Sequence, residues 1–159
     1  MTFKTTTRPE SISCASQFRR SAPFVELRNT LRSDPDIISP LVDQLVRFIA
    51  RYRNEDNFEI ELALSEALAN AIVHGNRADS QKRVFVSCRC STDGEVSITV
   101  QDEGQGFDVD AVPDPTTPDN RLGTGGRGIY LMKALMDEVC FEGRGSVVHM
   151  RKGFGRETK

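Results

Sequence analysis

Between positions 63 and 75 this 159-residue chain reads Ala63-Leu64-Ser65-Glu66-Ala67-Leu68-Ala69-Asn70-Ala71-Ile72-Val73-His74-Gly75. Glu66, Asn70 and His74 follow one another at intervals of four residues, which places them on one face of a predicted helix. The apolar neighbours expected to face a sheet are Leu64, Ala67, Leu68, Ala71 and Ile72. A carboxylate and an amide one turn apart supply oxygen ligands that suit a hydrated Mg²⁺. Taken alone, the segment fits a solvated polar face equally well.

A second segment, Asp102-Glu103-Gly104-Gln105-Gly106, follows directly after a predicted strand with alternating apolar residues. A carboxylate at a strand end can accept a hydrogen bond from the exocyclic amine of adenine. The two glycines allow the backbone to approach a ligand without Cβ clashes. The alternatives for this segment alone are a fragment of a calcium loop or a simple turn.

A third segment, Gly123-Thr124-Gly125-Gly126-Arg127-Gly128, runs into a predicted helix. Glycine-rich backbone at a helix N-terminus aims unpaired N–H groups and the positive end of the helix dipole at an anion, as in a phosphate site. The segment lacks the Gly-Lys-Ser/Thr of a Walker sequence and the βαβ surroundings of a dinucleotide fingerprint. A flexible loop preceding a helix is the alternative.

The remaining pattern predicts an α+β fold, a two-layer sandwich whose mostly antiparallel sheet carries helices on one face. The expected strands are Phe24–Leu31, Arg83–Cys90, Glu95–Gln101, Val139–Glu142 and Ser146–Arg151. The expected helices are one capped by Asp34 and running to Ile49, one from Asp56 to His74, and one from Gly128 to Asp137. Residues 103–126 form a loop of the length typical of a lid. The domain is expected over 23–153, with a disordered tail over 1–22 and a short tail over 154–159.

Composition limits the classes of function. Lys and Arg total 21 against 23 Asp and Glu, so the formal charge of −2 gives no support for nucleic acid as a partner. No secretory signal and no apolar run of membrane-spanning length is found, which predicts a cytoplasmic protein without a membrane partner. The four cysteines, Cys14, Cys88, Cys90 and Cys140, are expected to be buried reduced thiols, because their spacing does not fit a zinc site.

The order of the three segments resembles the N, G1 and G2 boxes of the gyrase–Hsp90–histidine kinase–MutL ATPase superfamily, which has the Bergerat fold. The resemblance covers about residues 24–152. Within the superfamily, the strings around Glu66–Gly75 and Gly126–Ile129 are similar to those of the anti-sigma-factor serine/threonine kinases. The resemblance therefore implies an ATP-binding domain that uses Mg²⁺.

The resemblance also implies roles for individual residues. Asn70 would ligate Mg²⁺, Glu66 would act as the general base, and Asp102 would bind the adenine amine. Gly104 and Gly106 would shape the base pocket, and Ser146 would support adenine through its hydroxyl. The expected phosphate-binding residues are Gly123, Thr124, Gly125, Gly126, Arg127 and Gly128. Apart from the resemblance, Arg121 or Arg127 could neutralise the γ-phosphate, and the sequence does not choose between them; a solvated arginine in a loop is the alternative.

Three functions remain open at this point. The first is a protein serine/threonine kinase that acts on a STAS-type anti-anti-sigma partner and is then free to sequester a sigma factor. The second is a partner-switching adaptor that binds ATP without catalysis. The third, a detached histidine kinase domain, is disfavoured because neither His74 nor His149 suits phosphate acceptance. The resemblance also implies a homodimer through the first strand and helix, although the apolar positions Val25, Leu27 and Leu31 fit a core equally well.

Overall fold

The computed structural model describes residues 22–117 and 126–153. The predicted tails over 1–22 and 154–159 lie, apart from Ala22, outside these ranges. The described elements are the strands β1 (Phe24–Arg32), β2 (Arg83–Ser91), β3 (Val96–Asp102), β4 (Glu138–Glu142) and β5 (Val147–Lys152), the helices α2 (Ile38–Ile49), α3 (Phe58–Ala69) and α4 (Arg127–Leu135), and the short helical turns η1 (Pro35–Ile37), η2 (Asn70–Gly75) and η4 (Gly143–Gly145). The part of the predicted lid that is described, 103–117, contains turns and no helix or strand.

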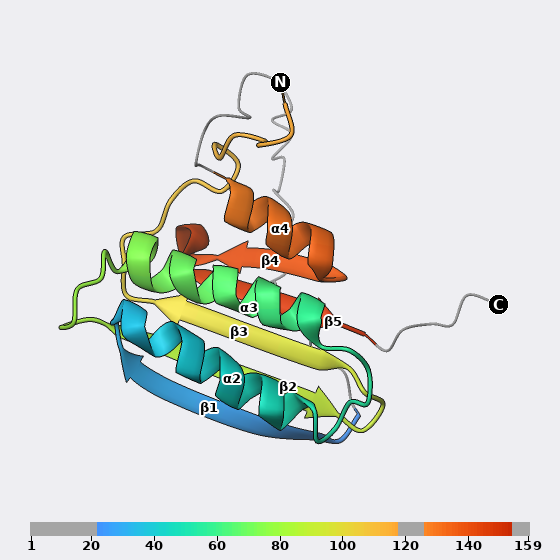
Figure 1. Cartoon of the computed structure of the whole chain (residues 1–159). Coiled ribbons are helices and arrows are strands. Elements are labelled where there is room, and N and C mark those ends of the chain that lie inside the picture. The colour runs from blue at the N-terminus through green and yellow to red at the C-terminus, as the bar shows by residue number, and fades with distance from the viewer. Residues whose placement is uncertain (1–21, 118–125, 154–159) are drawn as a thin grey trace, which may run out of the picture.

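The five strands form one antiparallel sheet in the order β1-β2-β3-β5-β4. Figure 1 shows α2, α3 and α4 lying side by side on one face of this sheet. The predicted α+β two-layer sandwich is therefore confirmed. Sequence order and spatial order differ at one place, because β5 pairs with β3 and leaves β4 at the edge.

The first helical region begins as the sequence predicts. The Asp34 carboxylate accepts the backbone N–H of Asp36 at 3.0 Å, and Pro35 occupies the first helical position. The first turn is 3₁₀, and α2 follows from Ile38. In the hairpin between β2 and β3, Gly94 takes a φ of 81° in the turn, a conformation that glycine adopts readily.

A continuous apolar core lies between the helix layer and the sheet. Its fully buried large side chains are Leu45, Ile49, Ile60, Leu64, Leu68, Ile72, Ile98, Met132, Met150, Val84, Val96 and Val100. Each buried aliphatic side chain of this size contributes roughly 1.5–3 kcal/mol. The predicted apolar face of the 63–75 segment contributes Leu64, Leu68 and Ile72 to this core. The polar face of the same segment therefore points away from the core, toward the candidate site.

The cysteine prediction is partly wrong. Cys88 and Cys90 are buried free thiols on the helix-facing side of β2, as expected. Cys140 on β4 is instead disulfide-bonded. Cys14 lies outside the described residues.

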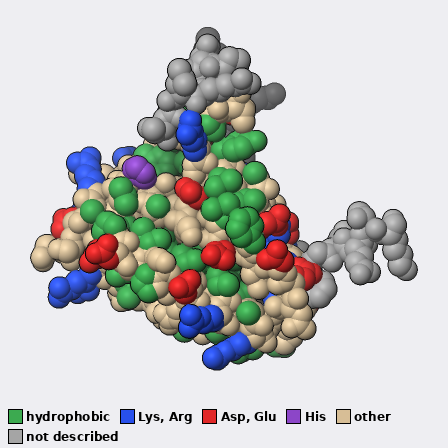
Figure 2. All heavy atoms as spheres, viewed as in Figure 1, with side chains coloured by type: hydrophobic (Ala, Val, Ile, Leu, Met, Phe, Trp, Pro, Cys, Tyr) green, Lys and Arg blue, Asp and Glu red, His purple; other side chains and the backbone are tan. Residues whose placement is uncertain are grey.

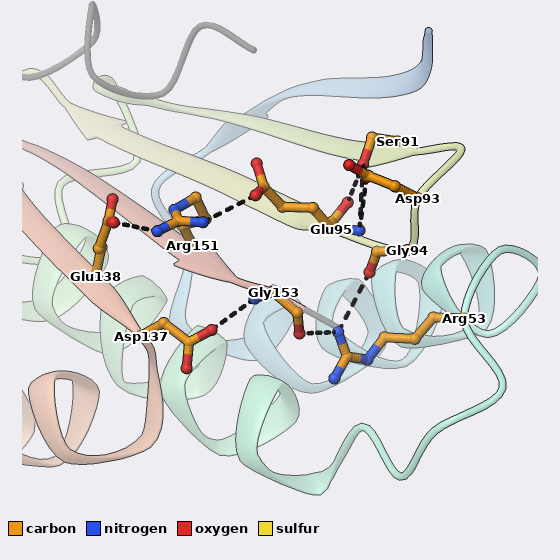
Figure 3. Close-up of polar contacts among 9 residues, drawn as sticks. All are labelled: Arg53, Ser91, Asp93, Gly94, Glu95, Asp137, Glu138, Arg151 and Gly153. Carbon is orange, nitrogen blue, oxygen red and sulfur yellow. Dashed lines mark hydrogen bonds and ion pairs between the residues drawn. The ribbon is translucent and has the colours of Figure 1, made fainter. Parts of the chain in front are cut away.

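At one end of the sheet, Arg53 joins three separate segments of the chain (Figure 3). The residue is 4% exposed, and its guanidinium donates to the carbonyl oxygens of Gly94 at 3.3 Å and Gly153 at 2.7 Å. It also pairs with the carboxylate of Glu55. Arg53 therefore ties the loop after α2 to the β2–β3 turn and to the end of β5.

No helix in the described part of the chain is long and apolar enough to cross a membrane.

Candidate functional site

The site is built on the polar side of α3 and the wider turn that follows it. Glu66 and Asn70 are half-buried, whereas Ala67 and Leu68 on the opposite side are buried. From Asn70 the helix continues as a π-helix to Gly75. Single π turns occur frequently at functional sites, where the extra residue per turn redirects side chains. His74 is exposed in the last turn of this element.

The N-terminus of α4 lies directly against this polar face. Gly126 precedes the helix with a φ of 82°. A Cβ placed on Gly128 would lie 2.8 Å from Glu66 Oε2 and 3.4 Å from Asn70 Oδ1. Only glycine fits position 128 without displacing one of these groups. The first segment therefore meets the described part of the third, Gly126–Gly128, and the N-terminus of α4 lies beside a carboxylate and an amide.

Asp102 lies at the end of β3, against the end of η2. The residue is 8% exposed, and its Oδ1 accepts the Gly104 N–H at 2.7 Å. A Cβ on Gly75 would lie 2.4 Å from Asp102 Oδ2, and a Cβ on Gly104 would lie 2.2 Å from the Gly75 carbonyl oxygen. The two glycines thus permit the closest approach of the helix end to the Asp102 carboxylate.

Burial raises the pKa of the Asp102 carboxyl above its ordinary value. The Gly104 N–H and the charge of Lys82 act in the opposite direction and offset only part of the rise. A ligand that donates a hydrogen bond to such a carboxylate stabilises its charged form, because the new hydrogen bond replaces hydration lost on burial.

The turn between β4 and β5 closes the site on the other side of Asp102. The Asp102 N–H donates to the Ser146 carbonyl at 2.9 Å, and the Ser146 hydroxyl donates to the Gly143 carbonyl at 2.8 Å. Gly106 has a φ of 74°, and a Cβ there would lie 2.3 Å from the Arg144 carbonyl oxygen. The turn that carries Ser146 therefore lies against both Asp102 and Gly106.

Asn76 is a residue that the sequence analysis missed. It is completely buried, its amide Nδ2 donates to the Arg83 carbonyl at 2.9 Å, and its Oδ1 accepts the Glu103 N–H at 2.9 Å. In the sequence, the pair Gly75-Asn76 is typical of a helix end, and no local pattern indicates that the Asn76 amide is buried.

The structure therefore brings together Glu66, Asn70 and Gly128 at one end of the polar surface, and Asp102, Gly104, Gly106 and Ser146 at the other. Arg127 is exposed as the first residue of α4. The predicted phosphate residues Gly123, Thr124 and Gly125, and the alternative γ-phosphate residue Arg121, lie outside the described residues.

A cavity of about 760 Å³ lies beyond Gly106. It is lined by Phe107, Lys133, Phe141 and Arg144 among others, and not by Glu66, Asn70 or Asp102. The cavity thus adjoins the polar residues described above and shares with them the loop after β3 and the turn between β4 and β5.

Comparison with known proteins identifies the family. The model of the histidine kinase-like ATPase domain matches residues 31–152, which include both ends of the site. The chain belongs to the histidine kinase-like ATPase domain family. The predicted resemblance is thereby confirmed at the level of the family.

Individual relatives of this ATPase domain carry regulatory names. A serine-protein kinase RsbW of Bacillus licheniformis is 31% identical over 87% of this chain and 91% of its own length. An anti-sigma F factor of Priestia megaterium is 37% identical over 59% of this chain and 67% of its own length. A crystal structure of RsbU and RsbW domains from Mycobacterium tuberculosis matches 80% of this chain and 31% of that chain, with a TM-score of 0.55 and 21% identity. The last comparison supports the fold.

The residues of this ATPase domain suit a nucleotide and its magnesium ion. Among the described residues, no group of three or more His, Cys, Asp or Glu side chains is arranged to hold a metal. Mg²⁺ commonly binds through one or two protein oxygens together with substrate phosphates and water. The Asn70 amide oxygen beside the Glu66 carboxylate, next to the open N-terminus of α4, fits that mode of binding.

Proposed function

We propose that the protein binds Mg²⁺-ATP between α3, the start of α4 and the loop after β3. One observation carries the proposal. Gly128 lies against Glu66 and Asn70, with room for no Cβ, while Gly75 and Gly104 bring the same helix end against Asp102. The helix start expected to bind phosphate and the expected oxygen ligand pair are thus linked through η2 to the buried carboxylate expected to accept the base amine.

Each group would have a distinct task. Asp102 would accept a hydrogen bond from the adenine amine, with Ser146 and the glycines Gly104 and Gly106 around the base. Asn70 would ligate Mg²⁺, whose role is to neutralise charge on the phosphates. The segment from Gly123 to Gly128, including Thr124 and Arg127, would donate N–H groups to the phosphates. Glu66 would accept the proton of the attacking hydroxyl.

We further propose that the γ-phosphoryl group is transferred to a serine or threonine of a STAS-type anti-anti-sigma partner. The name of the Bacillus licheniformis relative supports kinase activity, and the names of the anti-sigma F factors support a sigma factor as the alternate partner. Phosphorylation adds about −1.5 to −2 charges, which is enough to disrupt a protein interface. The unphosphorylated partner and the sigma factor would compete for this protein in the cytoplasm.

Two surfaces suit protein partners. Figure 2, viewed from the helix side, shows hydrophobic side chains exposed among separate acidic and basic groups. Phe58, Val73 and Tyr130, which lie on α3, η2 and α4, are 61%, 42% and 48% exposed. The edge strand β1 also exposes Phe24 and Val25, which supports the proposed homodimer through this strand and α2.

The second candidate is an ATP-binding, partner-switching adaptor without kinase activity. The name "anti-sigma F factor", carried by a relative that is 37% identical, describes binding and no catalysis. The Glu66 carboxylate favours the kinase, because a protein that only binds ATP has no need of a base beside the phosphates.

Replacement of Glu66 by Gln separates the two candidates. The test incubates the protein with labelled ATP, Mg²⁺ and STAS-type proteins from the same genome, and measures phosphoserine or phosphothreonine and ATP affinity. We expect transfer by the wild type, no transfer by Glu66→Gln and equal ATP affinity in both. Glu61→Gln, on the exposed side of α3, is the matched control. Full transfer by Glu66→Gln contradicts the assigned base, and ATP-dependent partner binding without transfer by the wild type supports the adaptor.

A further inference from the structure

Three segments that are far apart in the sequence meet at the side chain of Asn76. The residue follows η2, which carries Asn70, and its two side-chain hydrogen bonds reach Arg83, the first residue of β2, and Glu103, just after β3. The Glu103 carboxylate in turn accepts the Arg83 N–H at 2.6 Å. A closed ring of hydrogen bonds therefore joins the helix end to two strand ends.

The backbone around Asn76 is also fixed. Its own N–H donates to the Ala71 carbonyl at 2.8 Å, which closes the π turn, and the Ala78 N–H donates to the Ile72 carbonyl at 2.7 Å. Arg77 and Ala78 take φ values of 57° and 53°, in the left-handed region. Residues with a Cβ are strained in this region, so surrounding contacts must hold the turn in place.

The bond to Glu103 acts on the peptide unit that directly follows Asp102. Fixing that N–H fixes the direction in which the chain leaves β3, and hence the orientation of the Asp102 carboxylate against Gly75. The Asp102 side chain contacts the Gly104 N–H one peptide further on. Loss of the Asn76 bond would leave the part-buried Glu103 N–H without its partner and would free this peptide to rotate.

We propose that Asn76 is a positioning residue for base recognition: it holds the Asp102 carboxylate in a fixed relation to the Asn70-bearing turn. The inference rests on the proposed function, because it assumes that Asp102 receives the adenine amine. Asn76 itself contacts backbone groups of Arg83 and Glu103 and acts through them.

The preference for adenine over guanine tests this role, because the ratio of ATP to GTP affinity is measured on folded protein and does not change with stability alone. We expect Asn76→Ala to reduce the ratio by about tenfold or more, since the loss of one hydrogen bond of about 1.4 kcal/mol corresponds to roughly tenfold in affinity. Asn76→Asp keeps an acceptor for the Glu103 N–H and loses the donor to Arg83, so its ratio should lie between those of the wild type and the alanine variant.

Asn29→Ala is the matched control, because Asn29 carries a buried amide on β1 that has no hydrogen-bond partner for its Nδ2 among the described residues. Titrations with fluorescent ATP and GTP analogues, with circular dichroism to verify folding, give the ratios. If Asn76→Ala does not fold, the aspartate variant carries the test. A wild-type ratio in every folded Asn76 variant overturns the inference while leaving ATP binding intact. Absence of ATP binding by the wild type overturns the proposed function instead.

Discussion

Replacement of Gly75 by Ala tests the close approach of the end of η2 to the Asp102 carboxylate. The new Cβ would lie 2.4 Å from Asp102 Oδ2, 2.5 Å from its Cγ and 2.7 Å from Oδ1. Ordinary contact begins near 3.4 Å, so the carboxylate must move by roughly 1 Å. The clash is with the tip of a side chain, so the fold is expected to survive while Asp102 swings out of position.

The size of the effect follows from hydrogen-bond geometry. A bond of about 2.7–3.2 Å lengthened by about 1 Å leaves the bonding range. A hydrogen bond to a charged group contributes about 1.5–3 kcal/mol, which corresponds to a loss of roughly 10- to 150-fold in affinity. We therefore expect Gly75→Ala to bind ATP weaker by this factor, with a thermal midpoint close to that of the wild type.

Isothermal titration calorimetry with Mg²⁺-ATP measures the change. Gly153→Ala is the matched control, because its Cβ would also approach a carboxylate oxygen, that of Asp137 at 3.2 Å, at a position outside the site. ATP affinity of folded Gly75→Ala within twofold of the wild type would refute the role of the Asp102 carboxylate in base recognition.

Three further predictions concern stability and pH. Asp102→Asn should raise the thermal midpoint of the ligand-free protein near neutral pH, because it removes a buried charge; the advantage should shrink as pH falls through the raised pKa of Asp102, where the wild-type carboxyl becomes neutral. Because the pKa of Asp102 is raised, the wild-type carboxylate should become protonated, and ATP affinity should begin to fall, at a higher pH than for an ordinary aspartate. Calorimetry at decreasing pH measures this fall, and an affinity that stays constant through that range would contradict the prediction. Arg53→Met should lower the free energy of unfolding in urea by about 2–4 kcal/mol and leave ATP affinity unchanged, because Arg53 ties loops outside the site; an unchanged midpoint would count against that role.

The sequence predicted the elements well because their signals are local. Alternating apolar residues marked β2, and the Asp34-Pro35 pair marked the start of the first helical region. The antiparallel sheet with helices on one face followed from the order of these elements. Glu66 and Asn70 were found because helical spacing alone places them together.

The parts that the sequence did not predict depend on contacts between distant segments. The helix was expected to continue regularly to His74, but it widens into a π turn at Asn70, where the chain must meet Asp102 and the Arg83 strand end. The burial of Asn76 likewise depends on two strand ends that arrive from elsewhere in the chain. The tight approach of Gly128 to Glu66 could be stated only once α3 and α4 were seen side by side.

Binding of ATP with and without Mg²⁺, compared between the wild type, Asn70→Ala and Asp102→Asn, tests the central claim most directly. We expect the wild type to bind ATP more tightly with Mg²⁺, Asn70→Ala to lose the effect of Mg²⁺, and Asp102→Asn to lose the preference for adenine. A folded wild-type protein that binds no ATP at any Mg²⁺ concentration would contradict the proposed ATP site.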